Sequence, residues 1–330
     1  MRAGELIGPY VLERVLGHGQ ATVTWLARHP AWGAPLVVQL LDSGDPARGP
    51  YLRNAARASA AVHGDNCVQV REVQETRRGP ALVMDLIDGP TMAEWVRDSA
   101  PKLPVALDAF RGVLSAVEGC HRAGWIHRDL KPANVLMDLS GKRVAAYLTG
   151  FELARARSDP PEPPGPVGTP GYVAPEQWVQ GDHADERSDI FGLGCILYTL
   201  VAGRPPFRGV DSEAQQEAIR TGDFVPAARC AVALAPELSL LLGSMLDPVA
   251  RRRPQSVADV RAALGTVPLS RAGPPPPAPA FGRWAPSSLP VVTTPVPARA
   301  RSVLRGEDWM FLVVPMLVLM AGWMVRLAIG

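Results

Sequence analysis

The feature that most constrains the fold of this chain is a change in hydrophobic pattern near residue 91. Before that point, short stretches alternate between apolar and polar residues, and turn residues such as Gly79 and Pro80 separate them, which is typical of strands. One interruption in this strand-like part has the spacing of a helix. The strand-like stretches are 10–29, 34–41 and 68–87, and the helical interruption is 51–62.

After residue 91 the apolar residues recur at helical spacing. Leu107, Phe110 and Leu114 fall on one face of a predicted helix. The stretch 188–203 is apolar nearly all round, as in a helix buried inside a larger body. The sequence therefore predicts an α+β fold, in which a small sheet-rich lobe precedes a larger helical lobe with a cleft between them.

The composition is that of a globular protein and excludes several classes of function. Hydrophobic residues make up 47% of the chain and charged residues 20%, which suffices for a core. A net charge of +2 without a basic stripe argues against nucleic acid as a partner. The cysteines are far apart and form no CxxC pair, so neither a disulfide framework nor a zinc site is expected.

The stretch HRDLKPANVLM at 127–137 brings five residues with polar or charged side chains close together: His127, Arg128, Asp129, Lys131 and Asn134. It resembles the catalytic loop of Ser/Thr protein kinases. Further motifs of that family follow in the same order. They are LGHGQATV at 16–23, GTPGYVAPEQ at 168–177, SDIFGLGCILYTLVAGRPPF at 188–207 and DPVARRRPQSVADV at 247–260.

The resemblance implies a two-lobed protein-kinase-like domain over residues 5–265 and is closest in character to the membrane-anchored bacterial Ser/Thr (Hanks-type) kinases. The predicted small lobe covers about 5–88 and the helical lobe about 89–265. A proline-rich stretch, 266–308, then predicts an extended linker.

The last residues, 309–330, predict one transmembrane helix. No charge occurs from Trp309 to Val325, and Arg326 near the end can extend to the headgroups. Arginines are more frequent before this segment than after it, so the positive-inside rule predicts a cytoplasmic kinase-like domain on a single-pass protein of the cell membrane. The lipid bilayer is thus one expected partner.

In the family, ATP and Mg²⁺ are the cofactors, and the resemblance assigns roles to individual residues. Asp129 would accept the hydrogen bond of the substrate hydroxyl, Lys131 would offset charge on the transferred phosphoryl group, and Asn134 would bind one magnesium ion. The residues that the resemblance implies for the nucleotide are Gly17, Gly19, Val23, Val37, Gln39, Met84, Asp85, Leu86 and Leu136.

Several positions depart from the family pattern. Gln39 stands where the pattern has the phosphate-binding lysine, Asn54 where it has the helix glutamate, and Gly150 where it has the main metal-binding aspartate. Thr22 replaces the third glycine of the phosphate loop. No lysine precedes Lys102, so another lysine of the small lobe cannot replace the missing one.

Substitutes for the lost groups are conceivable from the sequence. Gln39 and Asn54 could form a neutral amide–amide hydrogen bond. Glu152 could reach a metal if the backbone reorganised; otherwise we expect it to be exposed or paired with an arginine. Arg14 or Arg28 could reach inward in place of the lysine, although solvation at the surface is the simpler expectation.

Other family positions with structural roles are retained. The resemblance implies that Phe151 packs between the lobes, that Glu176 pairs with Arg253, and that Asp189 braces the loop containing His127 and Arg128. Two hydroxyls of the intervening segment, Ser158 and Thr169, are candidate phosphosites.

These features leave three hypotheses open. The first is a catalytically impaired pseudokinase that acts as a scaffold or regulator for active kinases or their substrates. The second is an active Ser/Thr kinase with atypical metal binding, and the third is an ATP-sensing domain that transfers nothing.

Overall fold

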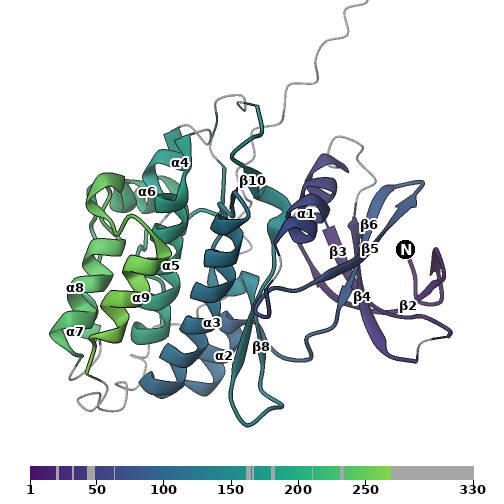
Figure 1. Ribbon diagram of the computed structural model, residues 1–330, viewed down its shortest axis with the longest axis horizontal. Coiled ribbons are helices and arrows are strands. Elements are labelled where there is room, and N and C mark those ends of the chain that lie inside the picture. Colours follow the sequence, from purple (N-terminus) through teal and green to yellow (C-terminus); the bar gives the residue numbers. More distant parts are fainter. Residues whose placement is uncertain are drawn as a thin grey trace, which may run out of the picture. The chain divides into compact units, whose positions relative to one another are not determined.

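The computed structural model describes residues 1–268 with internal gaps, and all of these residues belong to one compact unit, Met1–Thr294 (Figure 1). The predicted linker beyond residue 268 and the predicted membrane helix lie outside the described residues. Within the described ranges, no helix combines the length and the apolar character that crossing a bilayer requires. The gaps are 20–21, 32, 43–48, 63, 161–164, 166, 180–182, 210 and 231–233.

The first lobe is built around an antiparallel six-stranded sheet with the order β1-β2-β3-β4-β6-β5. The turn between β5 and β6 consists of Arg77 and Arg78. The predicted turn residues, Gly79 and Pro80, instead begin β6. The Thr76 hydroxyl closes the turn by donating to the Gly79 carbonyl at 2.7 Å. The strands are β1 (Leu6–Ile7), β2 (Tyr10–His18), β3 (Thr22–Arg28), β4 (Pro35–Leu41), β5 (Val70–Thr76) and β6 (Gly79–Asp85).

Strand alternation gives this sheet two faces with different surroundings. On β4, Val38 and Leu40 belong to a core cluster on the outer face, whereas Val37 and Leu41 belong to the main core. Because successive side chains point to opposite faces, Gln39 shares the face of Val37 and Leu41. That face is covered by helix α1 (Gly49–Ala61), which buries Leu52 in the main core.

The second lobe is helical, and the change of pattern near residue 91 coincides with its first helix. Thr91 caps the N-terminus of α2 through a capping box with Glu94. Helix α5 is buried nearly all round, as its sequence predicts, and ends at Gly203. The helices of this lobe are α2 (Met92–Ser99), α3 (Leu103–Arg122), α4 (Pro175–Val179), α5 (Glu186–Ala202), α6 (Ser212–Thr221), α7 (Ala227–Cys230), α8 (Pro236–Met245) and α9 (Val257–Gly265).

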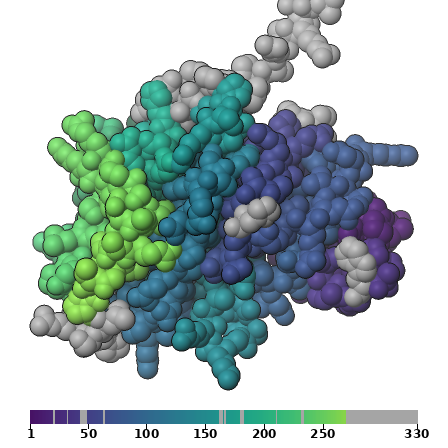
Figure 2. Space-filling view, in the orientation of Figure 1, coloured from purple at the N-terminus to yellow at the C-terminus, as the bar shows by residue number. Residues whose placement is uncertain are grey.

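Short strands and turns lie where the two lobes meet. The pair β8 and β9 forms one ribbon and the pair β7 and β10 another. The space-filling view shows the purple and blue residues of the sheet lobe and the green residues of the helical lobe at opposite ends of this unit (Figure 2). A β-rich small lobe and a helical large lobe are thus confirmed. The bounds are β7 (Trp125–Ile126), η2 (Pro132–Asn134), β8 (Val135–Asp138), β9 (Ala145–Leu148), η3 (Phe151–Leu153), β10 (Arg155–Ala156) and η5 (Ala250–Arg252).

Candidate functional site

The loop that begins at His127 is held in place by Asp189, a fully buried residue in the first turn of α5. Its carboxylate accepts hydrogen bonds from the backbone N–H groups of His127 and Arg128, both at 2.9 Å. Nε2 of His121 lies 2.7 Å from the same carboxylate. Burial alone would raise the pKa of Asp189, but the hydrogen bond and charge of His121 outweigh it and hold the pKa below its ordinary value. An ionised carboxylate therefore fixes this loop.

His127 is a structural residue of the loop. Its ring is fully buried, and burial lowers its pKa, so the imidazole is neutral at neutral pH. Nε2 lies 3.1 Å from the Thr149 carbonyl, and Nδ1 accepts the backbone N–H of Asp129 at 3.3 Å. The ring centroid lies 4.8 Å from that of Phe151, which is itself buried in the main core between the lobes.

The Asp129 carboxylate lies at the centre of a closed polar cluster. Lys131 Nζ lies 2.8 Å from Oδ2, Asn134 Nδ2 donates to Oδ2 at 3.0 Å, and the Thr169 hydroxyl donates to Oδ1 at 2.5 Å. Lys131 Nζ also lies 2.5 Å from the Thr169 hydroxyl. The structure thus brings together the three retained family positions, and the Lys131 ammonium group compensates the Asp129 carboxylate.

The two candidate phosphosites differ in accessibility. Ser158 is exposed. Thr169 is buried and its hydroxyl is engaged by Asp129 and Lys131, so a phosphate there requires the cluster to open. Phosphorylation of either residue stays a prediction.

On the opposite side of the site, Gln39 is engaged by Glu152. Gln39 Nε2 donates to Glu152 Oε1 at 2.8 Å and to the Thr22 hydroxyl at 3.3 Å. Glu152 is half-buried and accepts from this amide, and among the residues that the structure describes no arginine pairs with it. Its carboxylate is therefore directed to the small lobe rather than to Asn134, where a metal would need it.

Asn54 of helix α1 also binds the segment around Glu152. Its Nδ2 donates to the carbonyl of Glu152 at 3.3 Å and to the carbonyl of Ala154. These contacts take the place of the amide–amide bond that the sequence allows between Gln39 and Asn54, because both amides find acceptors on the segment that follows Phe151.

Gly150 has no room for a side chain. Its backbone is left-handed, with φ of 84°, and a Cβ built there would lie 2.6 Å from Nδ2 and 2.7 Å from Cγ of Asn134. Asn134 is in turn held by its hydrogen bonds to Asp129. An aspartate at position 150 would thus collide with the Asn134 amide. In the family pattern these two side chains bind metal side by side.

Strand geometry corrects one predicted nucleotide contact, Val23. Val23 lies in the outer core cluster with Trp25 and Val38, on the face opposite Val37. Thr24 is the residue that pairs with Gln39 across the ladder between β3 and β4. Val23 is thus one residue away from the position that faces Gln39, and a shift of one residue along a strand moves the side chain to the other face of the sheet.

The remaining predicted nucleotide residues lie on the inner side of the sheet or near it. Val37 pairs with Met84 across β4 and β6, and both belong to the main core, against which Leu86 and Leu136 pack. The Asp85 carboxylate forms an ion pair with Arg71.

The two predicted glycines lie at the end of β2. The N–H of Gly19 donates to the Thr22 carbonyl at 2.7 Å, and a Cβ at Gly19 would collide with the Thr22 hydroxyl. Gly17, within β2, pairs with Thr24 and has open space around it. Thr22, at the position of the third glycine, therefore occupies the space next to Gly19.

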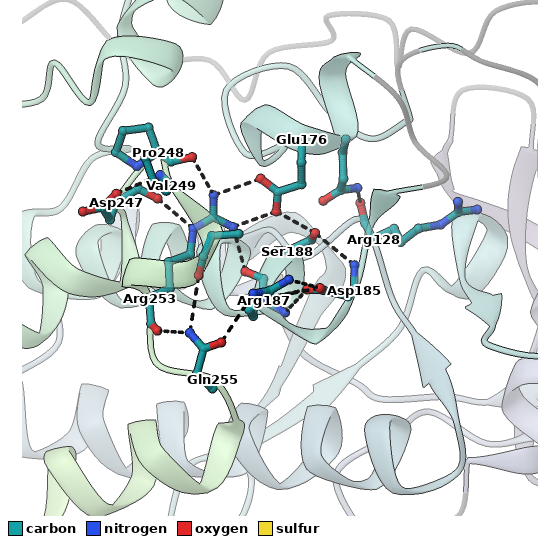
Figure 3. Close-up of polar contacts among 12 residues, drawn as sticks. Arg128, Glu176, Asp185, Arg187, Ser188, Asp247, Pro248, Val249, Arg253 and Gln255 are labelled. Atoms are coloured by element: carbon teal, nitrogen blue, oxygen red, sulfur yellow. Dashed lines mark hydrogen bonds and ion pairs between the residues drawn. The ribbon is translucent and has the colours of Figure 1, made fainter.

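The scaffold of the helical lobe is intact (Figure 3). Arg253 binds Glu176 through two hydrogen bonds of 2.7 and 2.9 Å, and its side chain is 0% exposed. Ser188 donates to the same carboxylate at 2.7 Å, and the guanidinium lies 5.0 Å from the centroid of the Phe191 ring. This pair joins helix α4, at the end of the GTPGYVAPEQ motif, to the segment after η5.

These residues do not fit Mg²⁺ and ATP phosphates in the manner that the resemblance implies. Of the expected metal donors Gly150 supplies none, and Asn134, whose Nδ2 donates to Asp129, could offer only its Oδ1. The phosphate side has Gln39 and the Glu152 carboxylate where a cation is required. Arg28 does not compensate, because it is half-exposed and pairs with Glu13 at 2.8 Å.

A cavity that the sequence did not indicate lies between the loop after α1 and the end of β6. It has a volume of about 330 Å³. Its lining combines carboxylates, a phenol and apolar side chains, from Asp65, Cys67, Val68, Gln69, Asp85, Ile87 and Tyr147.

Comparison with known proteins agrees with the two-lobed, kinase-like fold. The family of protein kinase domains matches residues 10–262. CBL-interacting protein kinase 19 of Oryza sativa is 34% identical over 251 residues, which are 74% of this chain and 48% of the relative. The Ser/Thr protein kinase PknB of Mycolicibacterium smegmatis is 33% identical over 268 residues, which are 77% of this chain and 42% of the relative. The matched part therefore spans less than half the length of these relatives.

Proposed function

The chain belongs to the protein kinase family, and we propose that within it this chain is a pseudokinase: a membrane-tethered scaffold or regulator of phosphorylation signalling. The observation that carries the proposal is the hydrogen bond from Gln39 to Glu152. It supports an arrangement in which a neutral amide binds the nearby carboxylate, where an active kinase needs a cation for the phosphates and a carboxylate for the metal.

The expected loss of rate is large. Removing one group that stabilises charge in a transition state typically lowers the rate by about 10²–10³. Such losses are not additive, but the absence of the lysine and of the aspartate together lowers the rate by roughly 10⁴–10⁶. From about 1–100 per second for active kinases, turnover would then take minutes to days. Ordinary signalling is faster than that.

The retained parts favour a role in binding. The Glu176–Arg253 pair and the Asp189 carboxylate keep the helical lobe in the form of a kinase. We propose that this lobe, or the proline-rich linker, presents a surface to active kinases or to their substrates. The apolar segment 309–330 would confine that surface to the membrane.

A second candidate, an active kinase with atypical metal use, is favoured by the cluster of Asp129, Lys131 and Thr169. That cluster holds the expected base, cation and hydroxyl within hydrogen-bond distance. The two candidates differ in what replaces the phosphate-binding lysine, at Gln39, and the metal-binding aspartate, at Gly150.

The deciding experiment combines two measurements on the full chain in mild detergent. Thermal unfolding is followed with ATP, with Mg²⁺ and with both, and phosphate transfer is followed from radiolabelled ATP to the chain and to casein. We expect no shift that needs Mg²⁺ and no label above that of the Asp129→Asn variant. Mg²⁺-dependent labelling that Asp129→Asn abolishes would overturn the proposal in favour of the active kinase. A shift with ATP and no label would replace the scaffold by an ATP sensor.

A further inference from the structure

Helix α1 is attached to the segment 152–159 by side chains that need no nucleotide. Asn54 donates to the carbonyls of Glu152 and Ala154, one helical turn before Arg57. Both residues project from the same side of α1 because they are three positions apart. The contact therefore has two adjacent points along one face of the helix.

The second point is an ion pair between Arg57 and Asp159. Nη2 of Arg57 lies 2.8 Å from Oδ1 of Asp159, and its guanidinium carbon lies 5.2 Å from the centroid of the Trp125 ring. The Asp159 side chain is only 22% exposed. The Arg57 side chain is 56% exposed, but its contacts with a carboxylate and an aromatic ring fix its direction more firmly than a single surface contact would.

Asp159 is also bound by its own segment. Its Oδ2 accepts the backbone N–H of Ala156 at 3.1 Å, and its backbone carbonyl accepts from Arg155 at 3.3 Å. The carboxylate thus connects three elements: helix α1, strand β10 and the turn that follows it. The negative charge of this carboxylate is bonded to Arg57 and also lies within the electrostatic influence of Arg155.

We propose that Asn54 and the Arg57–Asp159 pair form a standing lock, which holds α1 against the segment 152–159 in the absence of nucleotide, metal ion and phosphorylation. The negative charge that attracts Arg57 to this segment belongs to the Asp159 side chain itself and is therefore always present. The lock replaces the ion pair that Gln39 and Asn54 can no longer make. It stands independently of the proposed function, because it concerns the position of α1 and not phosphoryl transfer.

The test is hydrogen–deuterium exchange on the full chain, compared between wild type, Arg57→Gln and Asp159→Asn. We expect amides of 49–61 and 152–159 to exchange about two- to ten-fold faster in both variants, which corresponds to the loss of one ion pair with its hydrogen bond. ATP with Mg²⁺ should leave the wild-type pattern unchanged. The charge-swapped double variant, Arg57→Asp with Asp159→Arg, should recover a large part of the protection.

The matched control is Arg53→Gln. Arg53 lies on the same helix and forms a 2.7 Å ion pair with Glu75 of β5, so its loss should leave segment 152–159 unchanged. Exchange in the buried helix α5 reports global unfolding in every variant. Unchanged exchange in Arg57→Gln and Asp159→Asn, or protection of α1 that appears only with nucleotide, would overturn the lock.

Discussion

Gln39 on strand β4 and Glu152 in the short helix η3 are separated by more than a hundred residues, yet their side chains meet at 2.8 Å. The bond joins a neutral donor to a half-buried carboxylate. In this position it directs the acidic group that is nearest to Gly150 in the sequence toward the small lobe.

We predict that this bond contributes about 1 kcal/mol to stability, because it pairs a neutral amide with a partly exposed charged group. The measurement is a double-mutant cycle with Gln39→Ala and Glu152→Ala, followed by urea unfolding of the full chain. A coupling energy near zero would mean that the bond is not made in solution. As a control, Gln39→Ala combined with Glu217→Ala on α6 should be additive within about 0.5 kcal/mol.

We predict that Gly150→Ala destabilises the protein more than Gly203→Ala does. Both glycines are left-handed, at φ of 84° and 68°, and an L residue there costs about 1–2 kcal/mol. Only Gly150 has a neighbour, Asn134, in the way of a Cβ, whereas Gly203 has nothing within 4 Å. The collision should add about 1–3 kcal/mol in urea unfolding. Equal losses in the two variants would contradict the crowding at Gly150.

We predict that Arg253→Lys lowers the free energy of unfolding by about 2–4 kcal/mol. The lysine cannot reproduce the two-point contact with Glu176 and leaves a largely buried carboxylate incompletely bonded. Arg252→Lys, one residue earlier and exposed, should change stability by less than about 0.5 kcal/mol. A loss in the second variant that matches the first would show that the effect does not come from the pair.

We predict that stability falls as the pH drops below the ordinary histidine pKa of 6.5, and that His127 is one cause. Burial lowers the folded-state pKa of His127, so the unfolded chain takes up a proton before the folded chain does. The stabilisation from a neutral His127 is complete above the unfolded pKa and declines as the pH falls toward the folded pKa. The slope from this residue is at most about 1.4 kcal/mol per pH unit.

The corresponding measurement is urea unfolding at pH 7.5 and 5.5 for wild type, His127→Asn and His18→Gln. The pH dependence should be smaller in His127→Asn, whatever its overall stability. His18 is exposed, and its variant serves as the matched control. An undiminished pH dependence in His127→Asn would contradict the role of burial.

The sequence by itself determined the lobe order, the helical lobe and the loop from His127 to Asn134. These features depend on local signals: the period of apolar residues, the cap at Thr91 and a motif whose members are neighbours in the chain. It also determined which charged groups are missing, because Gln39 and Gly150 carry no charge in any fold.

Only the tertiary structure decided what replaces those charges. Glu152 binds Gln39, Asp159 binds Arg57, and Val23 lies on the sheet face opposite Val37, each because of partners distant in sequence or because of strand register. A side chain's charge can be read from its letter, but its nearest partner depends on backbone positions set by long-range packing. The lock between α1 and the segment 152–159 could therefore not be predicted from the sequence, although every residue that forms it is printed there.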